Sequence, residues 1–362
     1  MSERSELSRD EIIARSREAV EKALARNVPG LPRPEEVVGE LGFSPTPREV
    51  VYSRDILKLY HYPAVCEEVY RVPLLLVMSL VSKPYIFDLA KGQSLIEFLI
   101  GRGHDVYMID WGIPRPEHAK LSFADYVLDL IPDCVEQVAR DSGERDLTMV
   151  GYCLGGTLAA MYAAAHADGP LKNLVCLTTP VNSAGMELQR TWADPSHFDI
   201  DRLVDELGNI PPELVISSME MLRPLQRVSS RMKLLDNVGN DEFVKAHLRI
   251  ERWANDQIPF PGEVARQMQK DFLVGNKLFK GEFRVGKKQI DLGDISVPFL
   301  HVRALHDYLV PDESSRDLID LVSSEDKTDI VLKGGHVSLI AGGNAKYRLW
   351  PQIDAWLAER GV

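Results

Sequence analysis

The sequence predicts an α/β protein: a mostly parallel, doubly wound sheet with an inserted, mainly helical cap. Three observations support this fold class. Apolar, strand-like runs alternate with helical patterns along most of the chain, one long segment breaks this alternation, and a glycine-rich turn joins a strand to a helix. With 362 residues, 45% of them hydrophobic, the chain is long enough for one large domain with an insertion.

Seven strand-like segments form the predicted sheet, and several are apolar throughout, as parallel strands covered on both faces are. The first, 48–62, is either a hairpin or one long bent strand. The other strands are expected at 72–80, 104–112, 146–153, 173–180, 297–305 and 327–336. Helical patterns lie between them at 94–103, 123–141, 155–167, 312–324 and 346–361.

The alternation stops between residues 181 and 293, where the pattern becomes helical and prolines interrupt it. This segment falls between two sheet strands, so we expect a cap subdomain over the carboxyl edge of the sheet, where α/β proteins bind ligands. The core is then 49–180 and 294–362. Residues 1–48 form an N-terminal helical extension with an apolar stripe, which either packs on its own domain or contacts a partner.

Composition restricts the classes of partner. The chain carries 42 Lys and Arg against 54 Asp and Glu, and this net charge of −12 disfavours a nucleic-acid partner held through phosphate contacts. The charged N-terminus does not resemble a signal peptide, and no apolar stretch approaches the roughly 20 residues that cross a bilayer. We therefore expect a cytoplasmic protein with no transmembrane segment.

The four cysteines are scattered, with no CxxC pair, so neither a metal site nor a disulfide framework is expected. Cys66, Cys134 and Cys176 are interpreted as small buried side chains, the usual place of a free cysteine. Cys153 differs from them because glycines surround it.

The segment GYCLGG, residues 151–156, follows an apolar strand and opens an alanine-rich helix. This arrangement is typical of a nucleophile elbow, with Cys153 in place of the usual serine. Glycines flank the cysteine because a side chain there would collide with the neighbouring strand or helix. The N-terminus of the helix stabilises a thiolate, and the backbone N–H of Leu154 can donate to an oxyanion.

A cysteine nucleophile needs a base and an acid that orients the base, and this fold places them in the chain order nucleophile, acid, histidine. Asp307 follows the strand 297–305, and His336 follows two glycines at the end of the last strand. We expect His336 to take the proton of Cys153 and Asp307 to orient the imidazole. His306 is a rival, but as the neighbour of Asp307 it would point away from the shared site.

The second oxyanion donor is expected in the loop after an earlier strand, at the backbone N–H of Val81. A thiol suits a thioester substrate because exchange of one thiolate for another is nearly balanced in energy. The expected substrate is therefore an acyl-CoA, and a cap that excludes water favours transfer of the acyl group to an alcohol over hydrolysis.

Eight segments together resemble the polyhydroxyalkanoate synthases of the α/β-hydrolase superfamily, and within them the short catalytic (PhaC) subunit of the two-subunit, class III type. The resemblance runs from about Val50 to the C-terminus. Its segments are VPLLLVMSLVSKPYIFDL (72–89), GHDVYMIDWGIP (103–114), GYCLGGT (151–157), LVCLTTPVN (174–182), LGNIPPELV (207–215), LRIERWANDQIPFPGE (248–263), DYLVPDESS (307–315) and GGHVSLIAGG (334–343).

The resemblance implies polymerisation of (R)-3-hydroxyacyl-CoA, with 3-hydroxybutyryl-CoA the expected monomer, and release of CoA. It implies that Cys153 carries the growing chain as a thioester and that His336 is the base, assisted by Asp307. It leaves open which of these two groups activates the substrate hydroxyl. Many members have a histidine after this aspartate, whereas Tyr308 stands there in this chain. No cofactor and no metal is expected, since the CoA thioester is the substrate.

The resemblance, together with the chain length, also implies partners. They are a second synthase subunit of the PhaE type, a homodimer or hetero-oligomer, and the surface of polyester granules. Arg249 and Arg252, with Lys287 and Lys288, are weak candidates to meet the phosphates of CoA, and are otherwise ordinary solvated surface charges.

Two other functions remain open at this point. The first is a cysteine hydrolase of the dienelactone type, which shares the elbow but is expected to have little cap. The second is a catalytically inactive, granule-associated scaffold, which is expected to lose a member of the triad.

Overall fold

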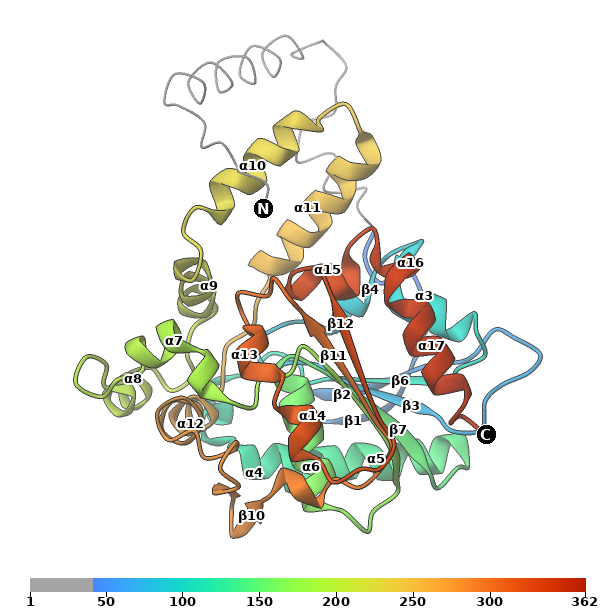
Figure 1. Ribbon diagram of the computed structural model, residues 1–362, viewed down its shortest axis with the longest axis horizontal. Helices are drawn as coiled ribbons and strands as arrows, with labels where there is room; N and C mark the ends of the chain where they lie inside the picture. Colours follow the sequence, from blue (N-terminus) through green and yellow to red (C-terminus); the bar gives the residue numbers. More distant parts are fainter. Residues whose placement is uncertain (1–41) are drawn as a thin grey trace.

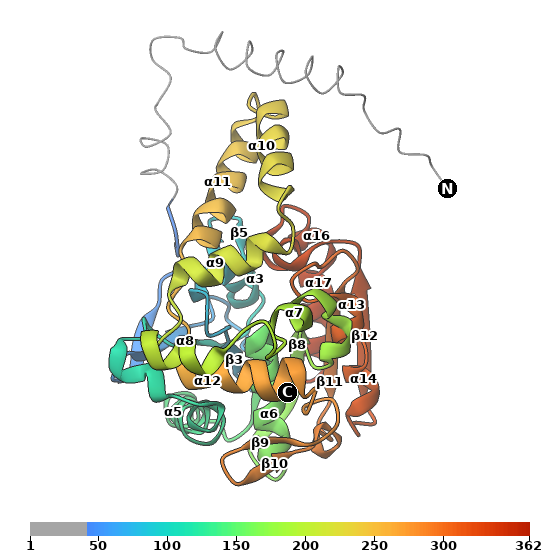
Figure 2. The same cartoon turned by 90° about the vertical axis from the view of Figure 1, so that its left-hand side faces the viewer.

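The computed structural model describes residues 42–362, in which helices cover both faces of a central sheet (Figures 1 and 2). The predicted extension, 1–48, lies outside the described residues up to residue 41, and residues 42–48 lead into the first strand. Among the described residues, no helix combines the length and apolar character needed to cross a membrane.

Eight strands form the sheet in the order β1-β2-β6-β3-β7-β8-β11-β12. The β1–β2 and β2–β6 pairs are antiparallel, and all the others are parallel, which confirms the predicted fold class. The segment 48–62 is a hairpin with Asp55 at φ 53° in its turn. The bounds are β1 Glu49–Arg54, β2 Leu57–Tyr62, β3 Leu74–Val77, β6 Val106–Asp110, β7 Leu147–Tyr152, β8 Leu171–Leu177, β11 Phe299–Ala304 and β12 Lys327–Leu332.

Successive side chains of the central strands pack into two separate cores. In β3, Leu75 and Val77 face one core while Leu74 and Leu76 face the other, and all four are at most 1% exposed. Burial of each such side chain stabilises the fold by about 1.5–3 kcal/mol. Both cores continue into the segment 181–293, through Val264 and Phe272 on one face and Trp253 on the other, so that segment is packed onto the sheet.

The helices of the core domain differ from the predicted ones in several places. The helix expected over 346–361 is two helices, α16 (Ala345–Arg348) and α17 (Trp350–Ala358), and α15 (His336–Ala341) was not expected. The helix expected over 123–141 contains a π-helical turn, η3 (Tyr126–Leu130), and the helix expected over 312–324 is two short helices. The bounds are α3 Leu95–Ile100, α4 Phe123–Asp125, α5 Ile131–Ser142, α6 Leu154–Ala165, α13 Asp312–Ser315, α14 Leu318–Leu321, α15 His336–Ala341, α16 Ala345–Arg348 and α17 Trp350–Ala358.

The segment 181–293 is mostly helical. Its α10 and α11 run side by side and stand out from the rest of the molecule in both ribbon views (Figures 1 and 2). A small hairpin, β9 (Phe283–Val285) with β10 (Lys288–Ile290), packs against α6. The helices are α7 Glu187–Trp192, α8 Ile200–Leu207, α9 Pro212–Met221, α10 Gln226–Asp236, α11 Asp241–Asn255 and α12 Gly262–Gln267, followed by the π-helix η5 (Met268–Val274).

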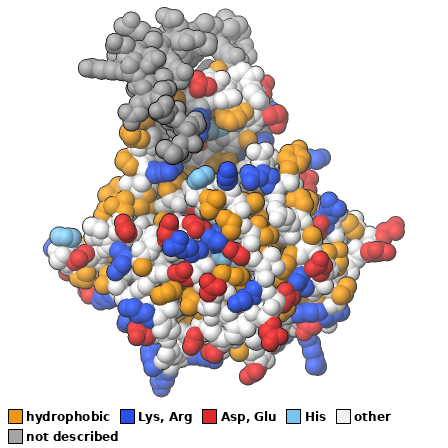
Figure 3. All heavy atoms as spheres, viewed as in Figure 1, with side chains coloured by type: hydrophobic (Ala, Val, Ile, Leu, Met, Phe, Trp, Pro, Cys, Tyr) orange, Lys and Arg blue, Asp and Glu red, His pale blue; other side chains and the backbone are white. Residues whose placement is uncertain are grey.

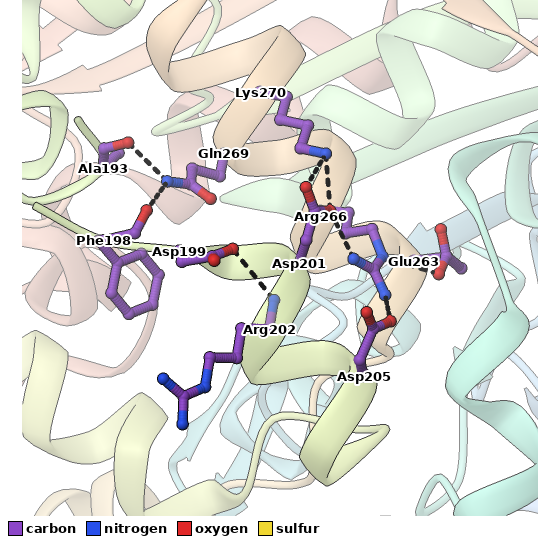
Figure 4. A network of polar contacts seen from close by, with 10 residues as sticks. All are labelled: Ala193, Phe198, Asp199, Asp201, Arg202, Asp205, Glu263, Arg266, Gln269 and Lys270. Carbon is purple, nitrogen blue, oxygen red and sulfur yellow. Dashed lines mark hydrogen bonds and ion pairs between the residues drawn. The ribbon is translucent and has the colours of Figure 1, made fainter. Parts of the chain in front are cut away.

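Charged side chains join α8 to α12 beside the small apolar cluster of this segment (Figure 4). The guanidinium of Arg266 lies 2.5 Å from a carboxylate oxygen of Asp201 and 2.5 Å from one of Asp205, and the Lys270 ammonium lies 2.6 Å from Asp201. Because Arg266 is 18% exposed, its own pairs are screened less than surface pairs are, whereas Lys270 and Asp201 are both about half exposed. These pairs fix the two helices relative to one another.

An ionic pair at the far edge of the sheet makes stability depend on pH. Arg303 of β11 donates to both oxygens of Asp329 on β12, at 3.1 and 2.7 Å. Burial alone raises the pKa of Asp329, but its interactions with His301 and Arg303 outweigh burial and hold the pKa well below its usual range. An unfolded aspartate has a pKa of about 3.9. The pair therefore stabilises the fold fully above about pH 5, and this stabilisation is lost as the pH falls below about 4.

We expect Asp329→Asn to lower the free energy of unfolding at pH 7 by about 1–3 kcal/mol, because a charge-assisted bidentate contact is lost. The difference between the two proteins should shrink below about pH 4, where wild-type Asp329 itself becomes protonated. Urea unfolding at pH 7, 5 and 3.5 measures both effects. A difference that grows toward low pH would contradict the assignment.

Candidate active site

Cys153 is the single residue between β7 and α6, with φ 57° and ψ −128°. A residue with a side chain rarely adopts a positive φ, and such a conformation costs about 1–3 kcal/mol. The turn is held on both sides: the Cys153 N–H donates to the Leu177 carbonyl of β8 at 2.9 Å, and its carbonyl accepts from the Gly156 N–H at 2.9 Å. The thiol is half-buried at the carboxyl edge of the sheet.

The glycines beside Cys153 are required by close packing, as the sequence predicts. A Cβ on Gly151 would lie 2.4 Å from the Cα of Gly156, in the first turn of α6. A Cβ on Gly155 would lie 2.2 Å from the Val77 carbonyl oxygen and 2.6 Å from the Met78 carbonyl carbon. The first turn of α6 is therefore pressed against the end of β3 and the loop that follows it.

This contact gives a stability prediction. Gly155→Ala forces a methyl group into backbone atoms that cannot rotate away, so we expect a loss of about 1–3 kcal/mol of unfolding free energy. The loop after β3 must shift to make room, so the acyl transfer that the sequence predicts for this site should fall as well. Thermal unfolding and an acyl-transfer assay measure the two effects. Gly143→Ala is a poor control because Gly143 has φ 77°, whereas Gly343→Ala adds a methyl group in open space and should change neither quantity.

His336 and Asp307 form a buried pair at the same edge of the sheet. The imidazole Nδ1 lies 2.5 Å from Asp307 Oδ2, and the two side chains are 4% and 0% exposed. The other carboxylate oxygen, Oδ1, accepts hydrogen bonds from the N–H groups of Leu309 and Val310, each at 2.9 Å. The loop after β11 therefore fixes the carboxylate, and the carboxylate fixes the imidazole. His336 is the first residue of α15 rather than the end of a strand.

The imidazole of His336 also interacts with the thiol of Cys153. Burial alone lowers the pKa of His336, but the charge of Asp307, the charge of the Cys153 thiolate and hydrogen bonds to both groups outweigh burial and raise the pKa. The ring of Tyr152 packs against the imidazole with 4.9 Å between ring centroids. Tyr152 therefore completes the packing around the imidazole, and nothing in its sequence context singles it out for this position.

The two predicted oxyanion donors belong to the first residue of α6 and to the loop after β3. Leu154 is the first residue of α6, so its N–H has no acceptor within the helix. Val81 belongs to the loop between β3 and η1 (Pro84–Phe87), the loop whose first residue, Met78, packs against Gly155. The structure thus brings the loop of Val81 to the N-terminus of α6.

The other candidate residues lie elsewhere. His306 is exposed, unlike its neighbour Asp307. Arg249 and Arg252 are on α11. Lys288 binds the carbonyl of Ala165, the last residue of α6. Ala165 lies about 18 Å along the helix from Cys153. This distance does not favour a contact between Lys288 and a thioester bound at Cys153. On the face drawn in Figure 3, Lys and Arg side chains lie among Asp and Glu rather than in one basic area.

The remaining cysteines separate into two kinds. Cys134 and Cys176 are fully buried, as predicted, and burial raises the pKa of Cys176 to about 12. The prediction that Cys66 is buried is wrong: it is half-exposed, and its S–H donates to the Gly101 carbonyl at 3.1 Å, because it lies in the loop after β2. Among residues 42–362, no group of His, Cys, Asp and Glu side chains could hold a metal ion.

Comparison with known proteins identifies the family. Residues 88–342 match the alpha/beta hydrolase fold, and residues 36–99 match the N-terminus of poly-beta-hydroxybutyrate polymerase (PhaC). The chain is 37% identical over 319 residues to poly(3-hydroxyalkanoate) polymerase subunit PhaC of Allochromatium vinosum, covering 87% of this chain and 89% of the relative. The chain belongs to the poly(3-hydroxyalkanoate) polymerase family.

Other members of the family differ in length. The PhaC subunit of Synechocystis is 35% identical, with 89% of this chain and 86% of the relative covered. The PhaC subunit of Haloferax mediterranei is 36% identical over 90% of this chain, which spans 66% of that relative. Among solved structures, a putative lipase from Sulfolobus solfataricus is similar in fold, with a TM-score of 0.58, 17% identity and coverage of 86% of this chain and 93% of the lipase.

Proposed function

We propose that this chain is the catalytic subunit of a polyhydroxyalkanoate synthase that polymerises (R)-3-hydroxyacyl-CoA, with 3-hydroxybutyryl-CoA as the monomer. Family membership makes the chain an enzyme of the acyltransferase type. The observation that carries the proposal is the contact of a buried His336–Asp307 pair with a cysteine in a strained elbow. These groups are a thiolate nucleophile, its base and the acid that orients the base.

In the first step, the Cys153 thiolate attacks the thioester carbonyl carbon of the acyl-CoA. The carbonyl oxygen becomes an oxyanion, which the N–H groups of Leu154 and Val81 stabilise. The C–S bond to CoA then breaks, and the leaving thiolate takes the proton that His336 carries. The products are free CoA and an acyl group bound to Cys153 as a thioester.

In the second step, the hydroxyl oxygen of another hydroxyacyl-CoA attacks the acyl carbon on Cys153. Its proton passes to the imidazole of His336, and the thiolate of Cys153 leaves. The product is an acyl-CoA that is longer by one unit, and it acylates Cys153 again with release of CoA. Each turn forms one ester bond and frees one CoA. Asp307 keeps Nδ1 protonated, so that Nε2 faces the reacting groups.

The proposal extends to the partners of the chain. They are a second synthase subunit of the PhaE type, in a homodimer or hetero-oligomer, and the surface of a polyester granule in the cytoplasm. Apolar side chains that meet such surfaces are available where α9 leads into α10: Met221, Leu225 and Val228 are 56%, 76% and 55% exposed. Polyester is apolar enough to cover side chains of this kind.

The test is incubation of the purified chain with 3-hydroxybutyryl-CoA, with and without a co-expressed second subunit. We expect release of CoA thiol and growing turbidity from insoluble polyester, both stronger with the second subunit. Thiol release without polymer would favour a cysteine hydrolase instead. Neither signal, even with the second subunit present, would favour an inactive scaffold.

A further inference from the structure

The loop that carries Val81 is held by the cap as well as by the elbow. The Val81 carbonyl accepts a hydrogen bond from the Ile258 N–H at 3.0 Å, and Ser82 forms an isolated antiparallel bridge with Gln257. The Val81 side chain packs against the apolar cluster of α8 and α12 that includes Val204. On its other side the loop meets the first turn of α6. The oxyanion loop is therefore sandwiched between the nucleophile and the cap.

Gln257 lies at the centre of this contact and is 7% exposed. Its Oε1 accepts a hydrogen bond from the Ser82 hydroxyl at 2.6 Å. Its Nε2 donates to the carbonyls of Trp253 and Ala254, each at 3.1 Å, near the C-terminal end of α11, where the Trp253 carbonyl also accepts the N–H of Asp256 at 3.0 Å. One buried amide thus joins the end of α11 to the oxyanion loop, with partners for both its polar atoms.

A second set of contacts continues this connection along the loop. The Lys83 ammonium lies 2.6 Å from Asp256 Oδ1, and the Tyr85 hydroxyl donates to Asp256 Oδ2 at 3.1 Å. The Trp253 indole N–H donates to the Lys83 carbonyl at 2.9 Å. Since α11 also packs against η1, the end of this projecting helix touches the loop from Val81 to Tyr85.

We propose that Gln257 is a positioning residue for acyl transfer. It fixes Ser82 and, with it, the backbone N–H of Val81, so the oxyanion site is complete only while the end of α11 is seated on the loop. The inference rests on the proposed function, since it takes Val81 as an oxyanion donor. The Val81 N–H lies 3.5 Å from the Ser79 hydroxyl oxygen, at the long limit of a hydrogen bond, and can therefore turn to a stronger acceptor.

Two reactions of Cys153 separate this role from a purely structural one. Acylation by a thioester passes through a tetrahedral intermediate and needs the oxyanion donors. Alkylation by iodoacetamide does not: the sulfur displaces iodide from a saturated carbon, and no oxyanion forms. Both reactions need the thiolate, so a collapsed active site lowers both, whereas a misplaced Val81 N–H lowers acylation alone.

The experiment compares Gln257→Met with Gln269→Met in the full-length chain. Gln269 is a matched control, because it is also a buried cap glutamine, 6% exposed, whose Nε2 donates to two carbonyls, those of Ala193 and Phe198 (Figure 4). The measurements are single-turnover CoA release from 3-hydroxybutyryl-CoA and the alkylation rate of Cys153. Ser82→Ala, which removes a single hydroxyl, is the second variant in case Gln257→Met does not fold.

We expect Gln257→Met to slow acylation roughly 10- to 100-fold, with the half-saturating substrate concentration within about 3-fold and the alkylation rate within about 2-fold of wild type. Ser82→Ala should show the same pattern, the double variant should be no slower than Gln257→Met, and Gln269→Met should match wild type in both reactions. Normal acylation in Gln257→Met and Ser82→Ala, or an equal fall of acylation and alkylation in both, would overturn the role. If iodoacetamide alkylates Cys153 of the wild-type chain but this chain releases no CoA from 3-hydroxybutyryl-CoA, the result would instead contradict the proposed function.

Discussion

Cys153→Ala is expected to abolish CoA release and polymer formation, with a loss of about 10⁴-fold or more in rate. The substitution removes the sulfur that we propose forms the acyl thioester, and neither His336 nor Asp307 can replace it. Thiol release and turbidity with 3-hydroxybutyryl-CoA measure the loss. The fold should persist, since alanine occupies less space at the same half-buried position.

The other cysteines are the controls for this variant. Cys66→Ala removes the half-exposed thiol, and Cys176→Ala removes a fully buried thiol in β8, the strand beside the elbow. Both variants should keep turnover close to wild type. Turnover that survives in Cys153→Ala, or that disappears in Cys66→Ala, would show that the chemistry depends on a different thiol.

Asp307→Asn is expected to lower acyl transfer by about 10⁴-fold while leaving the fold intact. An asparagine can keep its carbonyl oxygen toward the N–H groups of Leu309 and Val310, which Asp307 Oδ1 occupies now. Its NH₂ group then faces Nδ1 of His336 in place of the carboxylate oxygen at 2.5 Å. Two donors cannot face each other, so the imidazole carries its proton on Nε2 and cannot take one from the thiol.

The pH dependence of alkylation checks this explanation. In the wild type, the charge of Asp307 raises the pKa of His336, so a charged imidazole stays beside the sulfur over a wider range of pH than in Asp307→Asn. Alkylation of Cys153 by iodoacetamide should therefore be faster in the wild type over that range. Asp312→Asn is a suitable control, because Asp312 binds Arg303 and lies outside the triad. Equal pH profiles for wild type and Asp307→Asn would contradict the orienting role of the carboxylate.

The central strands, the elbow and the family were predictable from the sequence because each depends on local pattern. Val150 and Leu174 lie in continuous apolar runs that only a sheet covered on both faces can bury. The glycines around Cys153 predict that backbone segments approach closely there, and the structure shows which backbone atoms a Cβ on Gly151 or Gly155 would meet. The chain order of Asp307 and His336 follows from the fold.

Details that depend on distant partners were not predictable. His336 was expected at the end of a strand, but the Gly335 N–H donates to the Ser338 hydroxyl at 2.8 Å, and this contact starts a helix there. Ser82 and Gln257 are 175 positions apart, and nothing in the sequence of either segment indicates that they meet. Such pairs arise from the way the cap folds back on the core, and this is fixed by the whole chain.

The backbone conformation at Cys153 lowers the stability of the fold while it holds the thiol at the carboxyl edge of the sheet. Its positive φ subtracts about 1–3 kcal/mol from a net folding free energy that is only about 5–15 kcal/mol in typical proteins. A glycine at this position would relieve that strain at the expense of all turnover. A sequence chosen for stability alone would carry glycine here, and the proposed role of the sulfur in acyl transfer explains why a cysteine stands in this strained turn.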